Sequence, residues 1–144
     1  MTKTVIVSAC LLGLKTRYDG GDALSAEALK ELKGAIPIPV CPEVLGGLPT
    51  PRPRAEIGSG DGKDVLDGAS SVIDENGGDC TALFLRGAEA VLEIARLTGA
   101  REAFLKEKSP SCGVTLISRK GADEKGLGVT TALLQKEGLE TKGF

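Results

Sequence analysis

Three of the four cysteines occupy equivalent places relative to the expected strands. Cys10 directly follows the first apolar run, Cys41 directly follows the second, and Cys112 lies about six residues after the third. Because the carboxyl ends of parallel strands meet at one edge of a sheet, where ligands bind, such a fold would bring the three thiols together. Convergent thiolates are typical of a soft metal centre. Structural zinc ordinarily has four ligands, whereas an iron–sulfur cubane bound by three cysteines keeps one iron open.

Other interpretations of the cysteines stay open at this point. Free cysteine is often buried and behaves as a small apolar side chain, so these thiols can also be packing groups. The fourth, Cys80, lies at the start of the longest expected helix and is a further candidate ligand. A cysteine-nucleophile transferase is another possibility, with Cys41 or Cys112 activated by a helix N-terminus or by Lys108.

The chain contains no histidine. This excludes Ser-His-Asp and Cys-His triads, histidine-bound zinc, HExxH metalloproteases and histidine-ligated haem. It also removes the usual general base near neutral pH. Any chemistry therefore depends on carboxylates, hydroxyls, lysines, cysteines or a group that they bind.

Carboxylate and hydroxyl groups flank the cysteines. Glu43 lies two residues after the second cysteine, and Ser109 and Ser111 precede the third. Facing an open metal position, a carboxylate and a hydroxyl can transfer protons on a bound substrate. The alternative is a loop-anchoring carboxylate and two ordinary turn serines around a proline.

Arginines near the same segments are candidates for binding an anion. Arg52 and Arg54 either hold an anion or pair with acids such as Glu56. The Arg-Tyr-Asp segment at residues 17–19 is expected to help line the site.

The elements that must position these side chains follow from hydrophobic periodicity. Apolar runs predict strands, and amphipathic segments between caps and glycines predict helices. The strands are expected at residues 4–9, 36–40 and 102–106, and the helices at 25–33, 79–98 and 130–137. Pro37 and Pro39 are unusual for a central strand. Asp79 is the expected cap of the longest helix.

The remaining segments predict irregular or short structure. Residues 42–57 are proline-rich and predict a stiff ordered loop without helix. Residues 58–78 predict a small excursion with strand-like pieces around 65–66 and 71–74, and residues 114–117 predict another short strand. The alternation of strands and helices predicts a small three-layer α/β domain with a mostly parallel sheet. We expect one domain over residues 1–144, with its metal site at the carboxyl ends of the strands.

Composition excludes several classes of partner. Aromatic residues make up 3% of the chain and the formal net charge is −2. The chain therefore lacks the excess of basic residues and the aromatic side chains that bind nucleic acid. No apolar run approaches the roughly 20 residues of a membrane-spanning helix. Four cysteines are too few for a disulfide scaffold. The apolar run before Cys10 is too short for a signal segment, so we expect the chain to stay in the reducing cytoplasm.

Four ordered motifs resemble the 2-thiouracil desulfurase (TudS) family. They are VSACLLG at 7–13, RYDGG at 17–21, PVCPEVLGGLPTPRP at 39–53 and LKEKSPSCG at 105–113. The resemblance runs from residue 4 to about residue 137. It implies an enzyme with a [4Fe-4S] cluster bound by Cys10, Cys41 and Cys112, leaving the fourth iron free.

The family's chemistry implies roles for the flanking residues. The free iron would accept the sulfur of a small thiolated base such as 2-thiouracil, giving the oxo base and hydrogen sulfide without net redox change. The catalytic carboxylate would be Glu43, and the catalytic hydroxyl Ser109 or Ser111. The alternative is a non-catalytic iron–sulfur carrier or sensor. Residues 114–128 do not align clearly, and Cys80 has no counterpart, so the choice of substrate stays open.

Overall fold

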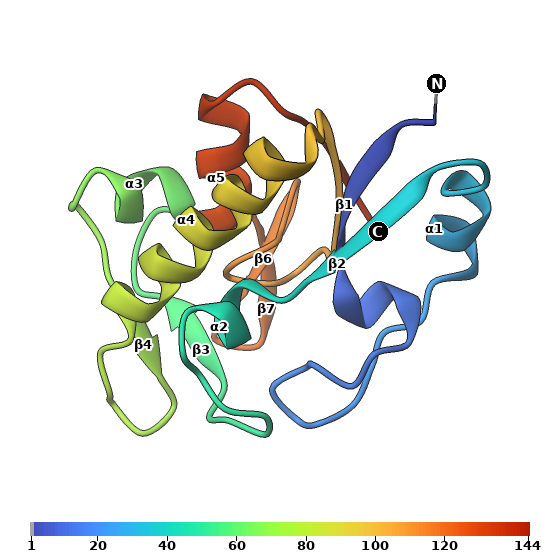
Figure 1. Ribbon diagram of the computed structural model, residues 1–144. Coiled ribbons are helices and arrows are strands. Elements are labelled where there is room, and N and C mark those ends of the chain that lie inside the picture. Colours follow the sequence, from blue (N-terminus) through green and yellow to red (C-terminus); the bar gives the residue numbers. More distant parts are fainter. Residues whose placement is uncertain (1) are drawn as a thin grey trace.

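A four-stranded parallel sheet forms the centre of the computed structural model, which describes residues 2–144 (Figure 1). All three strand pairings in this sheet are parallel. The strand order is β2 (Ile36–Val40), β1 (Thr4–Ser8), β5 (Glu102–Leu105) and β8 (Glu140–Gly143). The three predicted strands are therefore neighbours, and their carboxyl ends lie at one edge of the sheet.

Helices cover both faces of this sheet. On one face α4 (Thr81–Thr98) and α5 (Val129–Lys136) pack on the apolar side chains of β1, β2 and β5. On the other, α1 (Ala26–Glu31) and the 3-10 helix η1 (Ala9–Leu12) bury a second cluster that includes Val5, Val7 and Phe104. This arrangement confirms the predicted three-layer α/β class.

The two prolines of β2 are accommodated because this strand lies at the edge of the sheet. Pro37 and Pro39 stand opposite Val5 and Val7, and only β1 pairs with β2. The Ile36 N–H donates to the Lys3 carbonyl at 2.9 Å, so every second residue of β2, counted from Ile36, directs its nitrogen toward β1. The nitrogens of the prolines then fall on the free edge, where no ladder hydrogen bond is lost.

The middle of the chain differs from two of the predictions. Residues 42–45 form a helical turn, α2 (Pro42–Leu45), because proline is favoured at the first position of a helix. Residues 65–66 are not a strand but belong to α3 (Gly62–Leu66), which a reciprocal capping box of Asp61 and Asp64 initiates. The piece around 71–74 is a strand, β4 (Val72–Asp74), and pairs antiparallel with β3 (Ala55–Ile57).

Three further details of the elements differ from expectation. The strand expected at 114–117 lies later, as β6 (Leu116–Arg119), and forms a hairpin with the unpredicted β7 (Ala122–Lys125). The strand β8 is also unpredicted. Cys80, not Asp79, occupies the N-cap position of α4, while the Asp79 carboxylate accepts the Thr81 N–H at 2.9 Å. Among the described residues, no helix has both the length and the apolar character needed to cross a membrane.

Candidate metal centre and active site

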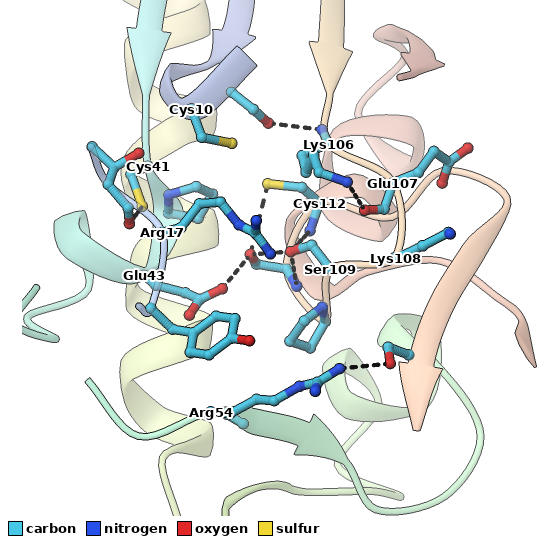
Figure 2. Close-up of a pocket in the computed structure, with 18 of the residues that line it drawn as sticks. Cys10, Arg17, Cys41, Glu43, Arg54, Lys106, Glu107, Lys108, Ser109 and Cys112 are labelled. Atoms are coloured by element: carbon cyan, nitrogen blue, oxygen red, sulfur yellow. Dashed lines mark hydrogen bonds between the residues drawn. The ribbon is translucent and has the colours of Figure 1, made fainter. Parts of the chain in front are cut away.

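A cavity of about 370 Å³ opens at the carboxyl ends of β1, β2 and β5 (Figure 2). The last residues of β1 and β2, Ser8 and Val40, line it, as does Lys106 directly after β5. All six residues that the sequence singled out as ligands or catalytic groups also line it: Cys10, Cys41, Glu43, Ser109, Ser111 and Cys112. The topology thus brings these residues together from three segments of the chain.

Each of the three cavity cysteines is held by the turn that follows its strand. Cys10 lies in η1, which ends at Gly13 with a left-handed φ of 90°. Cys41 is the residue between β2 and α2, and its Sγ lies 3.7 Å from the Thr16 carbonyl. The Cys112 N–H donates to the Ser109 hydroxyl at 3.0 Å, which fixes the turn after β5.

The N-terminus of α5 supports the turn that carries Cys112. The Val129 N–H donates to the Pro110 carbonyl at 2.8 Å, and the Thr130 N–H donates to the Ser111 carbonyl at 2.9 Å. These are two of the N–H groups that a helix N-terminus leaves without intrahelical partners. The backbone on either side of Ser111 is therefore anchored to a helix of the core.

Burial keeps two of the cavity thiols protonated in the free chain. All four cysteines are free thiols that form no disulfide. Burial raises the pKa of Cys112 to about 12, and the neighbouring Cys10 and Cys41 thiols add to this shift. Burial also raises the pKa of Cys10, and the neighbouring Cys41 raises it further by a smaller amount. Since the thiolate is the nucleophile and the metal ligand, these thiols are poor free nucleophiles and would release their protons on binding a metal.

The three thiols are a donor set that fits an iron–sulfur cluster. Within residues 2–144, no group of three or more Cys, Asp or Glu side chains converges closely enough to hold one metal ion. Yet three thiols line a single cavity, and Cys10 and Cys41 lie near enough to Cys112 to raise its pKa. In an iron–sulfur cluster each cysteine binds a separate iron, so the sulfurs need not converge on one point.

Cys80 does not belong to this set. It is buried with 6% of its surface exposed, inside the apolar cluster beneath α4. Its Sγ lies 3.4 Å from the Val72 carbonyl. The structure therefore places Cys80 outside the cavity, as a packing residue.

Glu43 is held at both carboxylate oxygens. The Ser111 hydroxyl donates to its Oε2 at 2.9 Å, and the Arg52 Nε–H donates to its Oε1 at 3.0 Å. The hydroxyl of Ser109 instead accepts the N–H groups of Ser111 and Cys112, at 3.2 and 3.0 Å. The two serines thus differ: Ser111 contacts the carboxylate, and Ser109 shapes the turn.

Two glycines let the helix of Glu43 approach α4. A Cβ at Gly87 would lie 2.7 Å from the Pro42 carbonyl carbon, and one at Gly46 would lie 3.0 Å from the Leu83 carbonyl carbon. Both distances are shorter than ordinary contacts, so the backbones of α2 and α4 meet where side chains are missing. This contact fixes α2, which carries Glu43, against α4.

The structure also settles the partners of the arginines. Arg52 pairs with Glu43 and not with Glu56, whose carboxylate accepts the Lys120 N–H at 2.8 Å. The guanidinium of Arg54 lies 5.7 Å from the Tyr18 ring centroid and donates to the Ser118 hydroxyl at 2.9 Å.

Of the expected segment 17–19, Arg17 and Tyr18 line the cavity, whereas the Asp19 carboxylate accepts the Gly21 N–H at 2.9 Å and does not line it. Lys106 is an additional cation in the cavity. Figure 2 shows Arg17 and Lys106 reaching into the space beside the labelled cysteines. Burial lowers the pKa of Lys106, and the positive charge of Arg17 lowers it further by a smaller amount. Sequence reasoning overlooked Lys106, although its position directly after the third predicted strand was a usable signal.

Comparison with known proteins gives consistent matches over almost the whole chain. A family model described as 2-thiouracil desulfurase matches residues 5–142. The uncharacterized protein YbbK of Bacillus subtilis (strain 168) is 41% identical over 137 residues, covering 93% of this chain and 91% of YbbK. A solved structure described as a [4Fe-4S]-dependent thiouracil desulfidase, TudS, is 42% identical with a TM-score of 0.82, covering 99% of this chain and 91% of that one.

Proposed function

The chain belongs to the 2-thiouracil desulfurase family, and we propose that it removes sulfur from a small thiolated base such as 2-thiouracil with a [4Fe-4S] cluster. The proposed ligands are Cys10, Cys41 and Cys112. The observation that carries this proposal is the shared cavity, in which three free thiols lie beside a carboxylate held by a hydroxyl. The lining residues come from segments between Ser8 and Asp123, so we propose that residues 1–144 act as one domain.

The size of the cavity supports a small substrate. Its volume of about 370 Å³ lies at the lower end of ordinary small-molecule sites. When bound, the cluster supplies one iron without a protein ligand, which can bind the sulfur of a thiocarbonyl.

The chain's own residues would manage the protons of the reaction. Water replaces sulfur at the thiocarbonyl carbon, so one water is consumed and hydrogen sulfide is released for each base. Glu43 Oε2 is the base that we assign to accept a proton from this water. The Ser111 hydroxyl, 2.9 Å from Oε2, orients the carboxylate and can pass the proton on toward the sulfur. With no histidine in the chain, this pair supplies the proton transfer.

Arginine and lysine side chains would orient the substrate in the same cavity. Arg17 and Lys106 lie beside the thiols, where a cation can bind a substrate oxygen or a developing negative charge. The Tyr18 ring, with its centroid 5.7 Å from the guanidinium carbons of both Arg17 and Arg54, forms part of the wall.

The test compares sulfide release with iron content. After anaerobic reconstitution, we expect Glu43→Gln to keep the iron of the wild type and to lose 10²- to 10⁴-fold in kcat, the range for a lost general base. The matched control is Glu93→Gln, whose carboxylate is 60% exposed on α4. Wild-type turnover in Glu43→Gln would remove this residue from the mechanism. An iron-loaded wild type that releases no sulfide would instead favour the carrier or sensor alternative.

A further inference from the structure

Arg52 is a buried charge beside the cavity. Only 3% of its side chain is exposed, whereas arginine is rarely buried unless it is paired. Among residues 2–144 its one carboxylate partner is Glu43, at 3.0 Å between Nε and Oε1. The cost of removing a guanidinium from water is high, so its remaining N–H groups also need partners.

Each N–H of the guanidinium has a partner in the described chain. The side chain carries five N–H groups in a fixed planar arrangement. Nε donates to Glu43, and Nη1 donates to the Pro49 carbonyl at 3.2 Å and the Thr50 hydroxyl at 3.1 Å. Nη2 donates to the Thr16 carbonyl at 2.9 Å and lies 3.9 Å from the Cys41 sulfur. One planar group therefore connects two loops, a carboxylate and a thiol.

The backbone reinforces the same connection. The Arg52 N–H donates to the Tyr18 carbonyl at 2.8 Å, so the loop before α1 is tied to Arg52 at its main chain as well. Cys41 and Arg52 share the Thr16 carbonyl as an acceptor, at 3.7 and 2.9 Å. Every contact of the Arg52 side chain thus leads to the cavity wall or to the loops that form it.

We propose that Arg52 is a positioning residue that holds the Glu43 carboxylate and the Cys41 sulfur in one fixed geometry. This inference rests on the proposed function, because it assigns no new reaction to the site. Arg52 acts through Glu43 and Cys41 and does not itself touch the substrate.

Lysine cannot replace Arg52 in this role. A lysine ammonium has three donors on a flexible stem and lacks the planar fork, so it cannot reach both the carboxylate and the opposite loop. The neighbouring Arg54 cannot substitute either, because its guanidinium is engaged by Tyr18 and Ser118. Loss of the guanidinium would leave Glu43 with one hydrogen bond, from Ser111.

Two consequences distinguish positioning from simple structural support. A carboxylate displaced by about 1 Å costs on the order of 10²-fold in kcat while substrate binding stays nearly the same. An N–H group directed at a cysteine sulfur also stabilises the reduced state of a cluster, since hydrogen bonds to the sulfurs are among the factors that set its potential. Removing that N–H should therefore lower the reduction potential.

The experiment uses Arg52→Lys and Arg52→Ala in the reconstituted full chain, with Arg96→Lys and Arg96→Ala as matched controls. Arg96 is 59% exposed on α4 and is not one of the residues that line the cavity. We expect Arg52→Lys to keep its fold and iron, to lose on the order of 10²-fold in kcat at little changed KM, and to show a lower cluster potential. In Arg52→Ala, added guanidinium should restore part of the lost turnover.

The contrary outcomes are equally specific. A folded Arg52→Lys protein with the kcat and potential of the wild type would overturn the proposal, as would an Arg52→Ala protein that guanidinium does not restore. If the wild type binds iron but releases no sulfide, the proposed function fails. The difference in potential between the wild type and Arg52→Lys still tests Arg52 in that case.

Discussion

Gly128 gives the most direct test of how the fold positions the turn that carries Cys112. Gly128 is the N-cap of α5, with a φ of −68° that any residue can adopt, so alanine introduces no backbone strain there. Its added Cβ, however, would lie 2.5 Å from the Ser111 carbonyl oxygen and 2.6 Å from the Cys112 nitrogen. Ordinary contacts begin near 3.4 Å, so the start of α5 and the backbone at Ser111 and Cys112 must move apart by about 1 Å.

This displacement predicts two measurable effects for Gly128→Ala. Overpacking of this size costs about 1–3 kcal/mol of unfolding free energy, which urea denaturation measures. A shift of about 1 Å in the group that orients Glu43 costs on the order of 10²-fold in kcat, which sulfide release measures.

Gly58→Ala is the matched control, because its added Cβ would meet the Ser71 carbonyl oxygen at an ordinary 3.6 Å. We expect this control to stay close to the wild type in both assays. If Gly128→Ala also matched the wild type in stability and in kcat, the close packing of α5 against the cysteine turn would not control the site.

Three further predictions concern the thiols and the serines. Cys112→Ser should lose bound iron after reconstitution, whereas Cys80→Ser should keep it, because Cys80 lies outside the cavity; equal iron in both variants would contradict the ligand set. Ser111→Ala should lower kcat by on the order of 10²-fold, whereas Ser109→Ala should chiefly cost about 1 kcal/mol of stability, measured by sulfide release and urea denaturation. The reverse pattern would exchange the roles of the two serines. In the iron-free protein, burial raises the Cys112 pKa from 9.0 to about 12. Above pH 9 the unfolded chain therefore loses this proton more readily than the folded chain, so the free energy of unfolding is unaffected below pH 9 and falls as the pH rises toward 12. The fall is at most about 1.4 kcal/mol per pH unit. Urea titrations against Cys112→Ser measure this loss, and a difference that does not change with pH would refute it.

The central strands and the meeting of the cysteines could be predicted from the sequence. Apolar runs make up most of β1 and β5, so the assignment of these segments as strands and their approximate limits follow from the local sequence pattern alone. Once these strands are parallel neighbours, the residues after them must share an edge. The positions of Cys10 and Cys41 follow from that rule, without any knowledge of side-chain contacts.

Other elements depend on tertiary contacts that the local pattern does not contain. The strand β8 reads ETKG, which has no apolar alternation, and it exists because β5 offers it a backbone ladder. Val65 and Leu66 have strand-like side chains, but the capping carboxylates of Asp61 and Asp64 favour a helix at that point. Their apolar side chains then pack in the cluster beneath α4.

The partner of Arg52 was ambiguous for a different reason. Glu43 lies nine residues before this arginine and Glu56 four residues after it, and both are possible ion-pair partners. The choice is made by the chain reversal at residues 46–51, which returns Arg52 to α2, and by the β3–β4 pairing, which carries Glu56 away. Neither effect is visible in a local sequence pattern.

Sulfide release from 2-thiouracil under anaerobic conditions tests the central proposal most directly. The reconstituted protein, carrying about four irons per chain, should form uracil and hydrogen sulfide in equal amounts, and the iron-free protein should form neither. Equal turnover by the iron-free protein would contradict the account, and so would an iron-loaded protein that leaves 2-thiouracil unchanged.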